Sequence, residues 1–84
     1  MWRVVLARAA VRGLSRAGPA DRLRLETALI SMQGDPFGGD VRRLAGRRRL
    51  FRRRIGDWRV IFAVSTGPRT VYVQSIVRRT STTY

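Results

Sequence analysis

The segment from 49 to 65 constrains the fold more than any other part of the chain. Two runs rich in apolar and β-branched residues, RLFRRRI and WRVIFAVS, are separated by only two residues, Gly56-Asp57. A short connection that contains Gly and Asp is typical of a tight antiparallel hairpin. This turn pairs Ile55 with Trp58. The pairing then fixes the face of the sheet on which each residue of both strands lies, because side chains alternate along a strand.

The register of this hairpin gathers arginines on one face. Arg54 lies opposite Arg59, and Arg52 lies opposite Ile61, and paired residues share a face. The other face is apolar and is the one we expect helices to cover; it consists of Phe51, Ile55, Trp58, Val60, Phe62 and Val64. Arg53 falls on this apolar side, so its side chain must reach out at an edge or mark a bulge.

A third strand is expected over 70–77, after a turn centred on Gly67-Pro68. Such a turn places Arg59 opposite Ile76 and Asp57 opposite Arg78. Arg78 then joins the arginine face, together with Tyr72, Gln74 and Ile76, whereas Val71, Val73 and Val77 join the apolar face. The expected core therefore includes Phe51, Trp58, Phe62, Val71 and Val73.

The first half of the chain has a different periodicity. Residues 2–6 form an apolar, β-branched run that predicts a short strand. Apolar residues at helical spacing then predict helices over 7–16 and 20–32, separated at Gly18-Pro19. The 84 residues leave room for a single domain, 1–84. We predict an α+β fold of order β-α-α-β-β-β, with both helices packed on one face of a mainly antiparallel sheet of four strands.

The charge of the chain indicates an anionic partner. Eighteen basic residues, all of them Arg, oppose five acidic ones, for a net charge of +13. Such an excess repels itself unless a polyanion or an acidic protein neutralises it. Arginine also binds phosphate with two parallel hydrogen bonds and stacks on bases, so nucleic acid is the first expectation. Apolar runs are too short to span a membrane, no signal peptide is evident at the N-terminus, and we expect a cytoplasmic protein.

Composition excludes most catalytic chemistry. The sequence has no Cys and no His, and its five carboxylates are scattered along the chain. No metal site, small-molecule cofactor or phosphate-binding loop is therefore expected. RNA, however, carries its own nucleophile, the 2′-OH beside each phosphate, and arginines can stabilise the charge that develops when it attacks. Tyr84 is the candidate base, if nearby cations favour its phenolate.

The sequence resembles the RelE/ParE superfamily of bacterial toxins from type II toxin–antitoxin modules. The resemblance covers nearly the whole chain, and its most specific part is the block FRRRIGDWRVIF from Phe51 to Phe62. Other parts are Gly34-Asp35-Pro36 after the second helix, and Ile76-Val77-Arg78-Arg79 followed by Tyr84. The resemblance implies a RelE-like fold and favours the RelE-like branch, whose members cut messenger RNA on the ribosome without a metal.

The resemblance also implies a role for each site residue. Arg52, Arg54 and Arg59 match positions that stabilise the phosphate. Arg78 matches a late arginine proposed to assist the leaving group. Tyr84 matches a tyrosine proposed to activate the 2′-OH or to stack on a base. The implied partners are an acidic antitoxin protein, the ribosome and mRNA.

Two other functions remain open at this point. A ParE-like protein of the same fold would inhibit DNA gyrase and cut no RNA, although such chains tend to lack the full set of arginines with a late tyrosine. A non-catalytic basic RNA-binding module would bind RNA in a salt-dependent way without cleaving it.

Overall fold

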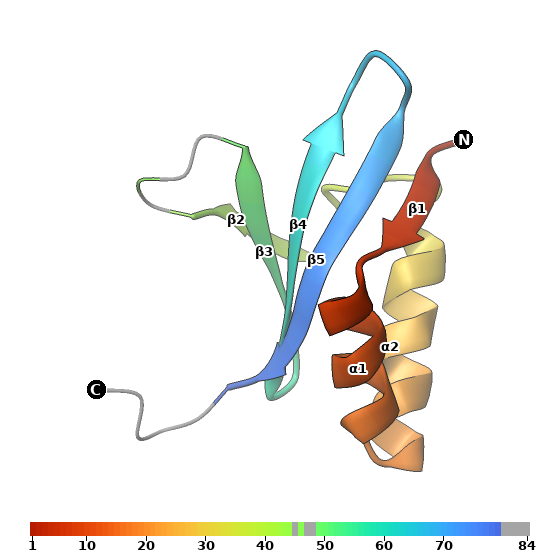
Figure 1. Cartoon of the computed structure of the whole chain (residues 1–84), viewed down its shortest axis with the longest axis vertical. Helices are drawn as coiled ribbons and strands as arrows, with labels where there is room; N and C mark the ends of the chain where they lie inside the picture. Colours follow the sequence, from red (N-terminus) through yellow and green to blue (C-terminus); the bar gives the residue numbers. More distant parts are fainter. Residues whose placement is uncertain (45, 47–48, 80–84) are drawn as a thin grey trace.

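The computed structural model describes all residues except 45, 47–48 and 80–84. Its elements follow in the order β1 (Arg3–Leu6), α1 (Arg8–Arg16), α2 (Pro19–Ser31), β2 (Asp40–Arg43), β3 (Leu50–Ile55), β4 (Trp58–Ser65) and β5 (Thr70–Arg78). The strands form one sheet in the order β1-β5-β4-β3-β2. β1 pairs with β5 in parallel, and the other neighbours are antiparallel. Both helices lie on one face of the sheet (Figure 1), which confirms the predicted α+β fold.

The break between the two helices lies where the sequence predicts it. Gly18 caps α2 in an extended conformation, and Pro19 is the first helical residue, a position where the missing N–H costs no hydrogen bond. The prediction of four strands is wrong, because Asp40–Arg43 forms a fifth, β2. This strand has only one apolar residue, Val41, and owes its conformation to pairing with β3. Local sequence therefore gave no signal for it.

The core lies between the helices and the sheet. Trp58, Phe62, Val71 and Val73 are buried there as predicted. Phe51 is half-buried, and its ring stacks on that of Phe62 with 5.6 Å between centroids. Two apolar residues of the helices lie outside the core: Val11 is 53% and Leu23 is 64% exposed.

Helix α1 lies unusually close to the sheet at Gly13. A Cβ atom built on Gly13 would lie 1.9 Å from the carbonyl oxygen of Ile76 in β5. Only glycine permits this approach, because any other residue would place a carbon far closer to that oxygen than non-bonded contact allows. The buried side of α1 consists of small residues, Ala10 and Gly13, with Ala17 following directly after the helix. This contact explains why Val11 points away from the core.

The pairing of β4 with β5 contains a bulge that the sequence analysis did not anticipate. Phe62 pairs with Val73, but Ile61 pairs with Ser75, so Gln74 has no opposite residue in β4. Between the bulge and the C-terminal end of β5, Arg59 lies opposite Val77 and Trp58 lies opposite Arg78. The predicted pairs of Arg59 with Ile76 and of Asp57 with Arg78 are therefore wrong.

The bulge also exchanges the faces of the residues beyond it. Ile76 is 2% exposed and belongs to the core, whereas Val77 is 46% exposed. The extra residue at Gln74 shifts the alternation of side chains by one. The prediction assumed a ladder without a bulge, which would place Ile76 among the arginines and Val77 in the core. Both placements are therefore wrong.

Arg53 lies on the helix side of the sheet, and β3 accommodates it without a bulge. Its guanidinium donates hydrogen bonds to the carbonyl oxygen of Ala28 at 3.2 Å and to Ser31 Oγ at 2.9 Å. Both acceptors belong to the last turn of α2, at the negative end of the helix dipole, which favours a cation. Arg53 therefore anchors the end of α2 to the sheet.

Candidate nucleic-acid interface

The face of the sheet opposite the helices carries the predicted arginines. The β3–β4 register has Arg54 opposite Arg59 and Arg52 opposite Ile61, as the two-residue turn predicts. These positions alternate with residues such as Trp58 and Val60, which are buried beneath the helices. Arg52, Arg54 and Arg59 are thus brought together on the open face.

The unexpected strand β2 adds two residues to this face. Arg42 pairs with Arg52, and Asp40 pairs with Arg54. We refer to Arg42, Arg52, Arg54 and Arg59 as the open-face arginines. Asp40 and Arg42 are two residues apart, so they share a face of the sheet when the segment forms a strand. Because β2 was not predicted from the sequence, this shared face was not predicted either.

The open-face arginines oppose one another across the strands. Arg42 with Arg52, and Arg54 with Arg59, are directly opposite pairs of like charge, an arrangement that destabilises a sheet. The one ion pair found among the described residues joins Arg24 and Asp21 of α2 at 3.9 Å, away from this face. The open face is therefore a concentrated cationic surface, with Asp40 as its nearest acidic side chain along the ladder.

Arg59 has an unused hydrogen-bond donor. Its Nε atom is buried and has no hydrogen-bond partner within the part of the chain that the structure describes. Buried polar groups are usually paired, and leaving one unpaired is costly. An anionic oxygen that entered the open face would supply the missing acceptor.

Of the two other predicted site residues, Arg78 is not assembled with these arginines. The bulge places Arg78 opposite Trp58, on the helix side of the sheet, where it lines a pocket with Gly13, Arg16 and Ile76. The prediction that Arg78 shares a face with Arg52, Arg54 and Arg59 is therefore wrong. Tyr84 lies outside the described residues.

The described residues contain no group of three or more His, Cys, Asp or Glu side chains arranged to hold a metal ion. None of their helices is both long enough and apolar enough to cross a membrane.

Solved structures of toxins share this architecture. The chain superposes on RelE in the RelE–RelB complex of the archaeon Pyrococcus horikoshii with a TM-score of 0.84 and 25% identity, over 95% of this chain and 97% of that one. It is also similar to the isolated Escherichia coli RelE toxin, with a TM-score of 0.82, 15% identity and coverage of 99% and 89%. A YoeB/ParE toxin from Agrobacterium tumefaciens matches with a TM-score of 0.78, 16% identity and coverage of 93% and 99%.

The fold is that of small toxins of the RelE/ParE type. No family model and no curated protein matches the sequence. The solved structures nevertheless confirm the resemblance to the RelE/ParE superfamily, and the chain has the RelE fold over nearly its entire length.

Proposed function

We propose that this protein is the toxin of a type II toxin–antitoxin module and acts as a metal-independent endoribonuclease on mRNA in the ribosome. The observation that carries the proposal is the open-face cluster, in which Arg42 opposes Arg52 and Arg54 opposes Arg59. In addition, the buried Nε of Arg59 has no hydrogen-bond partner among the described residues. A cluster with this internal repulsion is stabilised when a phosphodiester lies between its members.

In this proposal the substrate supplies the nucleophile. The 2′-oxygen attacks the neighbouring phosphorus, the bond from phosphorus to the 5′-oxygen breaks, and the products are a 2′,3′-cyclic phosphate and a 5′-hydroxyl. The pentavalent intermediate carries more negative charge than the diester, so positioned arginines stabilise the transition state more than the bound substrate. Tyr84 is proposed to accept the 2′-OH proton or to stack on a base, and Arg78 to assist the leaving oxygen.

A cleavage assay on programmed ribosomes tests this function. Purified protein should cut the mRNA in the ribosome in the presence of EDTA, and primer extension should locate the cut. A DNA supercoiling assay with gyrase, run beside it, tests the ParE-like alternative, which the likeness to a YoeB/ParE toxin keeps in view. Gyrase inhibition without RNA cleavage would reject the proposal, and so would salt-dependent RNA binding with neither activity.

We also propose an acidic antitoxin as the protein partner. The structures from P. horikoshii and Mycobacterium tuberculosis are toxin–antitoxin complexes, and this chain carries a charge of +13. A groove of about 610 Å³ between α2 and the β2–β3 edge combines apolar side chains, Leu23 and Ile55, with three cations and one carboxylate: Arg24, Arg53, Arg54 and Asp40. This combination suits an acidic amphipathic segment that orders on binding.

Growth of cells that produce the protein tests the partner. Production of this chain alone should slow growth, and co-production of the acidic protein encoded by the neighbouring gene should restore it. Normal growth with the chain alone, at an expression level confirmed by immunoblot, would contradict the toxin proposal.

A further inference from the structure

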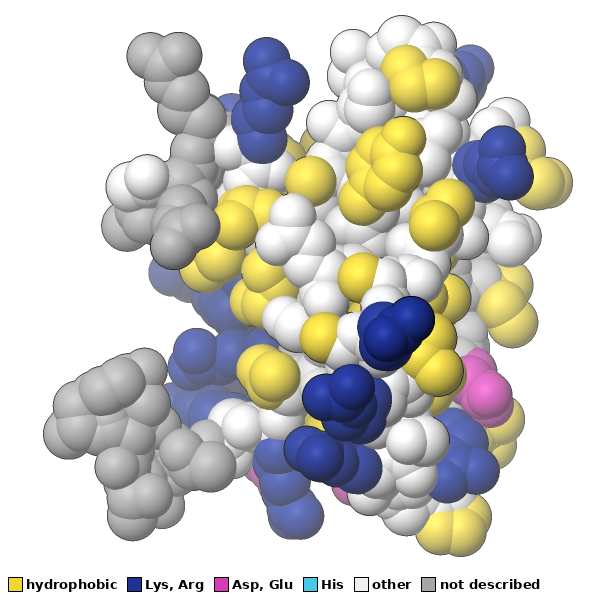
Figure 2. Space-filling view, viewed as in Figure 1, with side chains coloured by type: hydrophobic (Ala, Val, Ile, Leu, Met, Phe, Trp, Pro, Cys, Tyr) yellow, Lys and Arg dark blue, Asp and Glu magenta, His cyan; other side chains and the backbone are white. Residues whose placement is uncertain are grey.

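A second row of arginines lies on the other side of the molecule, along α1. Arg8, Arg12 and Arg16 are spaced four residues apart, and all three are exposed. This spacing places them on one side of the helix, with successive Cα atoms about 6 Å apart along the axis. Figure 2 shows Lys and Arg side chains gathered over the part of the surface that α1 forms in Figure 1. We call Arg8, Arg12 and Arg16 the α1 ridge.

The ridge is unfavourable for the helix that carries it. Arg8 is the first helical residue, the first turn has no acidic residue, and Ala7 provides no side-chain cap. A cation at this end opposes the helix dipole, and like charges four residues apart repel each other. The described residues contain no ion pair to any of the three arginines. No acidic side chain among the described residues therefore offsets this repulsion, and an external anion would do so.

The bulge in β5 extends this surface. It places Arg78 on the helix side of the sheet, where Arg78 and Arg16 line a pocket of about 380 Å³. The floor of the pocket is formed by Gly13, Trp58 and Ile76. The cationic row thus continues from the end of α1 toward the end of β5, whereas the open-face arginines lie on the opposite side of the sheet.

We propose that the α1 ridge binds the phosphate backbone of double-helical RNA. The distance between successive arginines is comparable to that between successive phosphates of a strand, and each guanidinium can hold a phosphate through two hydrogen bonds. Ala9 and Ser15 are short, so the arginines project beyond their neighbours. Protein interfaces concentrate apolar and aromatic residues at their centre, whereas α1 has no aromatic residue and exposes one large apolar side chain, Val11. The lack of aromatic residues likewise favours a duplex over single-stranded RNA, which binds by stacking.

This site goes beyond the proposed function: of the described residues given a role in RNA cleavage, only Arg78 lies on the helix side of the sheet, and it is not a member of the α1 ridge. A protein that cuts mRNA within a large folded RNA could hold the RNA scaffold with the ridge while the open-face arginines reach the strand to be cut. Binding to an isolated duplex requires no cleavage, however, so failure of the endoribonuclease proposal would leave the ridge proposal intact, and the reverse also holds.

Binding of the full-length protein to a labelled RNA hairpin tests the ridge. The stem should have about 16 base pairs, the length that double-stranded-RNA domains span, and fluorescence anisotropy should be measured over a range of KCl concentrations. The variant Arg8→Ala/Arg12→Ala/Arg16→Ala should lower the slope of log K against log salt by about 2–3, since each of the three lost phosphate contacts removes roughly 0.7–0.9.

The matched control is Arg3→Ala/Arg43→Ala/Arg49→Ala, which removes the same charge from three exposed arginines elsewhere. Its slope should fall by clearly less than that of the ridge variant. Equal losses in the two variants would mean that only net charge matters, and would overturn the proposal.

A lysine variant and a competing peptide distinguish phosphate binding from helix damage and from protein binding. Arg8→Lys/Arg12→Lys/Arg16→Lys keeps the charge and should keep the salt slope; loss of the slope would point to damage of the helix instead of lost phosphate contacts. A glutamate-rich peptide serves as the competing anion. If the alanine ridge variant loses affinity for the peptide but not for the duplex, the ridge is a protein-binding surface and the RNA proposal is wrong.

Discussion

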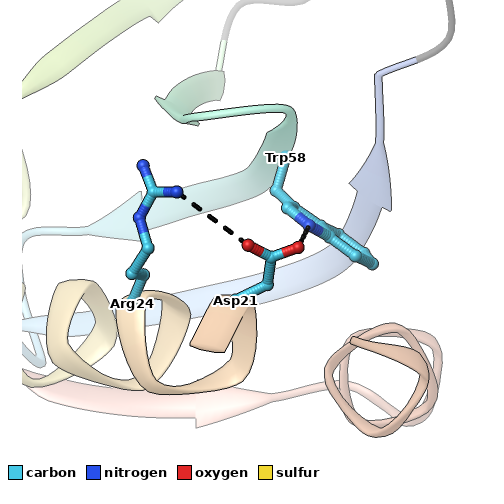
Figure 3. A network of polar contacts seen from close by, with 3 residues as sticks. All are labelled: Asp21, Arg24 and Trp58. Carbon is cyan, nitrogen blue, oxygen red and sulfur yellow. Dashed lines mark hydrogen bonds and ion pairs between the residues drawn. The ribbon is translucent and has the colours of Figure 1, made fainter. Parts of the chain in front are cut away.

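The indole Nε1 of Trp58 donates a hydrogen bond to Asp21 Oδ2 at 3.1 Å, which joins the start of β4 to the first turn of α2 (Figure 3). Asp21 Oδ1 also lies 3.9 Å from Arg24 Nη1. Asp21 is favourable at this end of a helix. The hydrogen bond lies directly beside the turn that brings Arg54 opposite Arg59, so it fixes the helix layer to the hairpin that carries the candidate site.

Trp58 should be the most sensitive residue of this junction. Trp58→Ala should lower the free energy of unfolding by about 3–5 kcal/mol, because it removes a large buried ring, and a domain of this size would then be largely unfolded. Trp58→Phe keeps a ring and loses the donor. Urea unfolding of Trp58→Phe, Asp21→Ala and the double variant should give a coupling of about 1 kcal/mol, the usual contribution of one hydrogen bond. Additive effects would mean that the hydrogen bond contributes nothing.

Gly13→Ala should destabilise the protein, although alanine normally stabilises a helix interior by about 1 kcal/mol relative to glycine. The added Cβ would lie 1.9 Å from Ile76 O, and the helix would have to move away from β5. We expect a loss of about 3 kcal/mol, at the upper end for overpacked sites, measured by thermal or urea unfolding. Gly67→Ala is the control, since a Cβ there meets nothing within 4 Å. A stable Gly13→Ala variant would mean that α1 lies farther from the sheet.

Arg52→Thr should stabilise the free protein. Arg52 lies opposite Arg42 on one side and Ile61 on the other, so threonine removes a like-charge pair and suits a strand. We expect a gain of up to about 1 kcal/mol at low salt, which should shrink at 1 M salt as screening removes the repulsion. Arg3→Thr, opposite Thr70, serves as the comparison. A lower urea midpoint for Arg52→Thr than for Arg3→Thr would show that Arg52 does not destabilise the free protein.

Arg59→Ala should slow mRNA cleavage far more than it weakens ribosome binding. Loss of one positioned charge-stabilising contact typically lowers the rate by about 10²–10³. Single-turnover cleavage on saturating programmed ribosomes measures the effect, with Arg3→Ala as the control for lost charge. Arg78→Ala should slow cleavage similarly if Arg78 assists the leaving group, even though it lies on the helix side of the sheet. Wild-type rates in both the Arg59 and the Arg78 variant would reject the site assignment.

Tyr84→Phe separates the two roles proposed for Tyr84. If the phenol accepts the 2′-OH proton, the single-turnover rate should fall steeply and its dependence on pH should change. If the ring only stacks on a base, phenylalanine should retain most of the activity, since stacking needs no hydroxyl. Tyr84→Ala distinguishes either role from none: an unchanged rate in that variant would remove Tyr84 from the mechanism.

The two-residue turn at Gly56-Asp57 was enough to predict the β3–β4 register and the shared face of Arg52, Arg54 and Arg59. A short turn leaves only one way to pair the flanking strands, and alternation then assigns every side chain to a face. The helix break at Gly18-Pro19 was equally local, because proline fixes its own φ and lacks an N–H, and glycine disfavours a helix interior through its conformational freedom. These features were therefore determined by sequence alone.

The tertiary structure decided what depends on contacts between distant segments. β2 exists because β3 pairs with it, and Val11 is exposed because Gly13 lets α1 approach Ile76. The sequence contains one sign of the bulge. Strict alternation after Val71 and Val73 would put the next apolar residue at position 75, but position 75 is Ser and the next core residue is Ile76. That irregular spacing becomes a bulge only when Ile76 is drawn into the core beneath α1. Burial of one side chain thereby moved Arg78 to the other side of the sheet, an outcome that strand alternation could not predict.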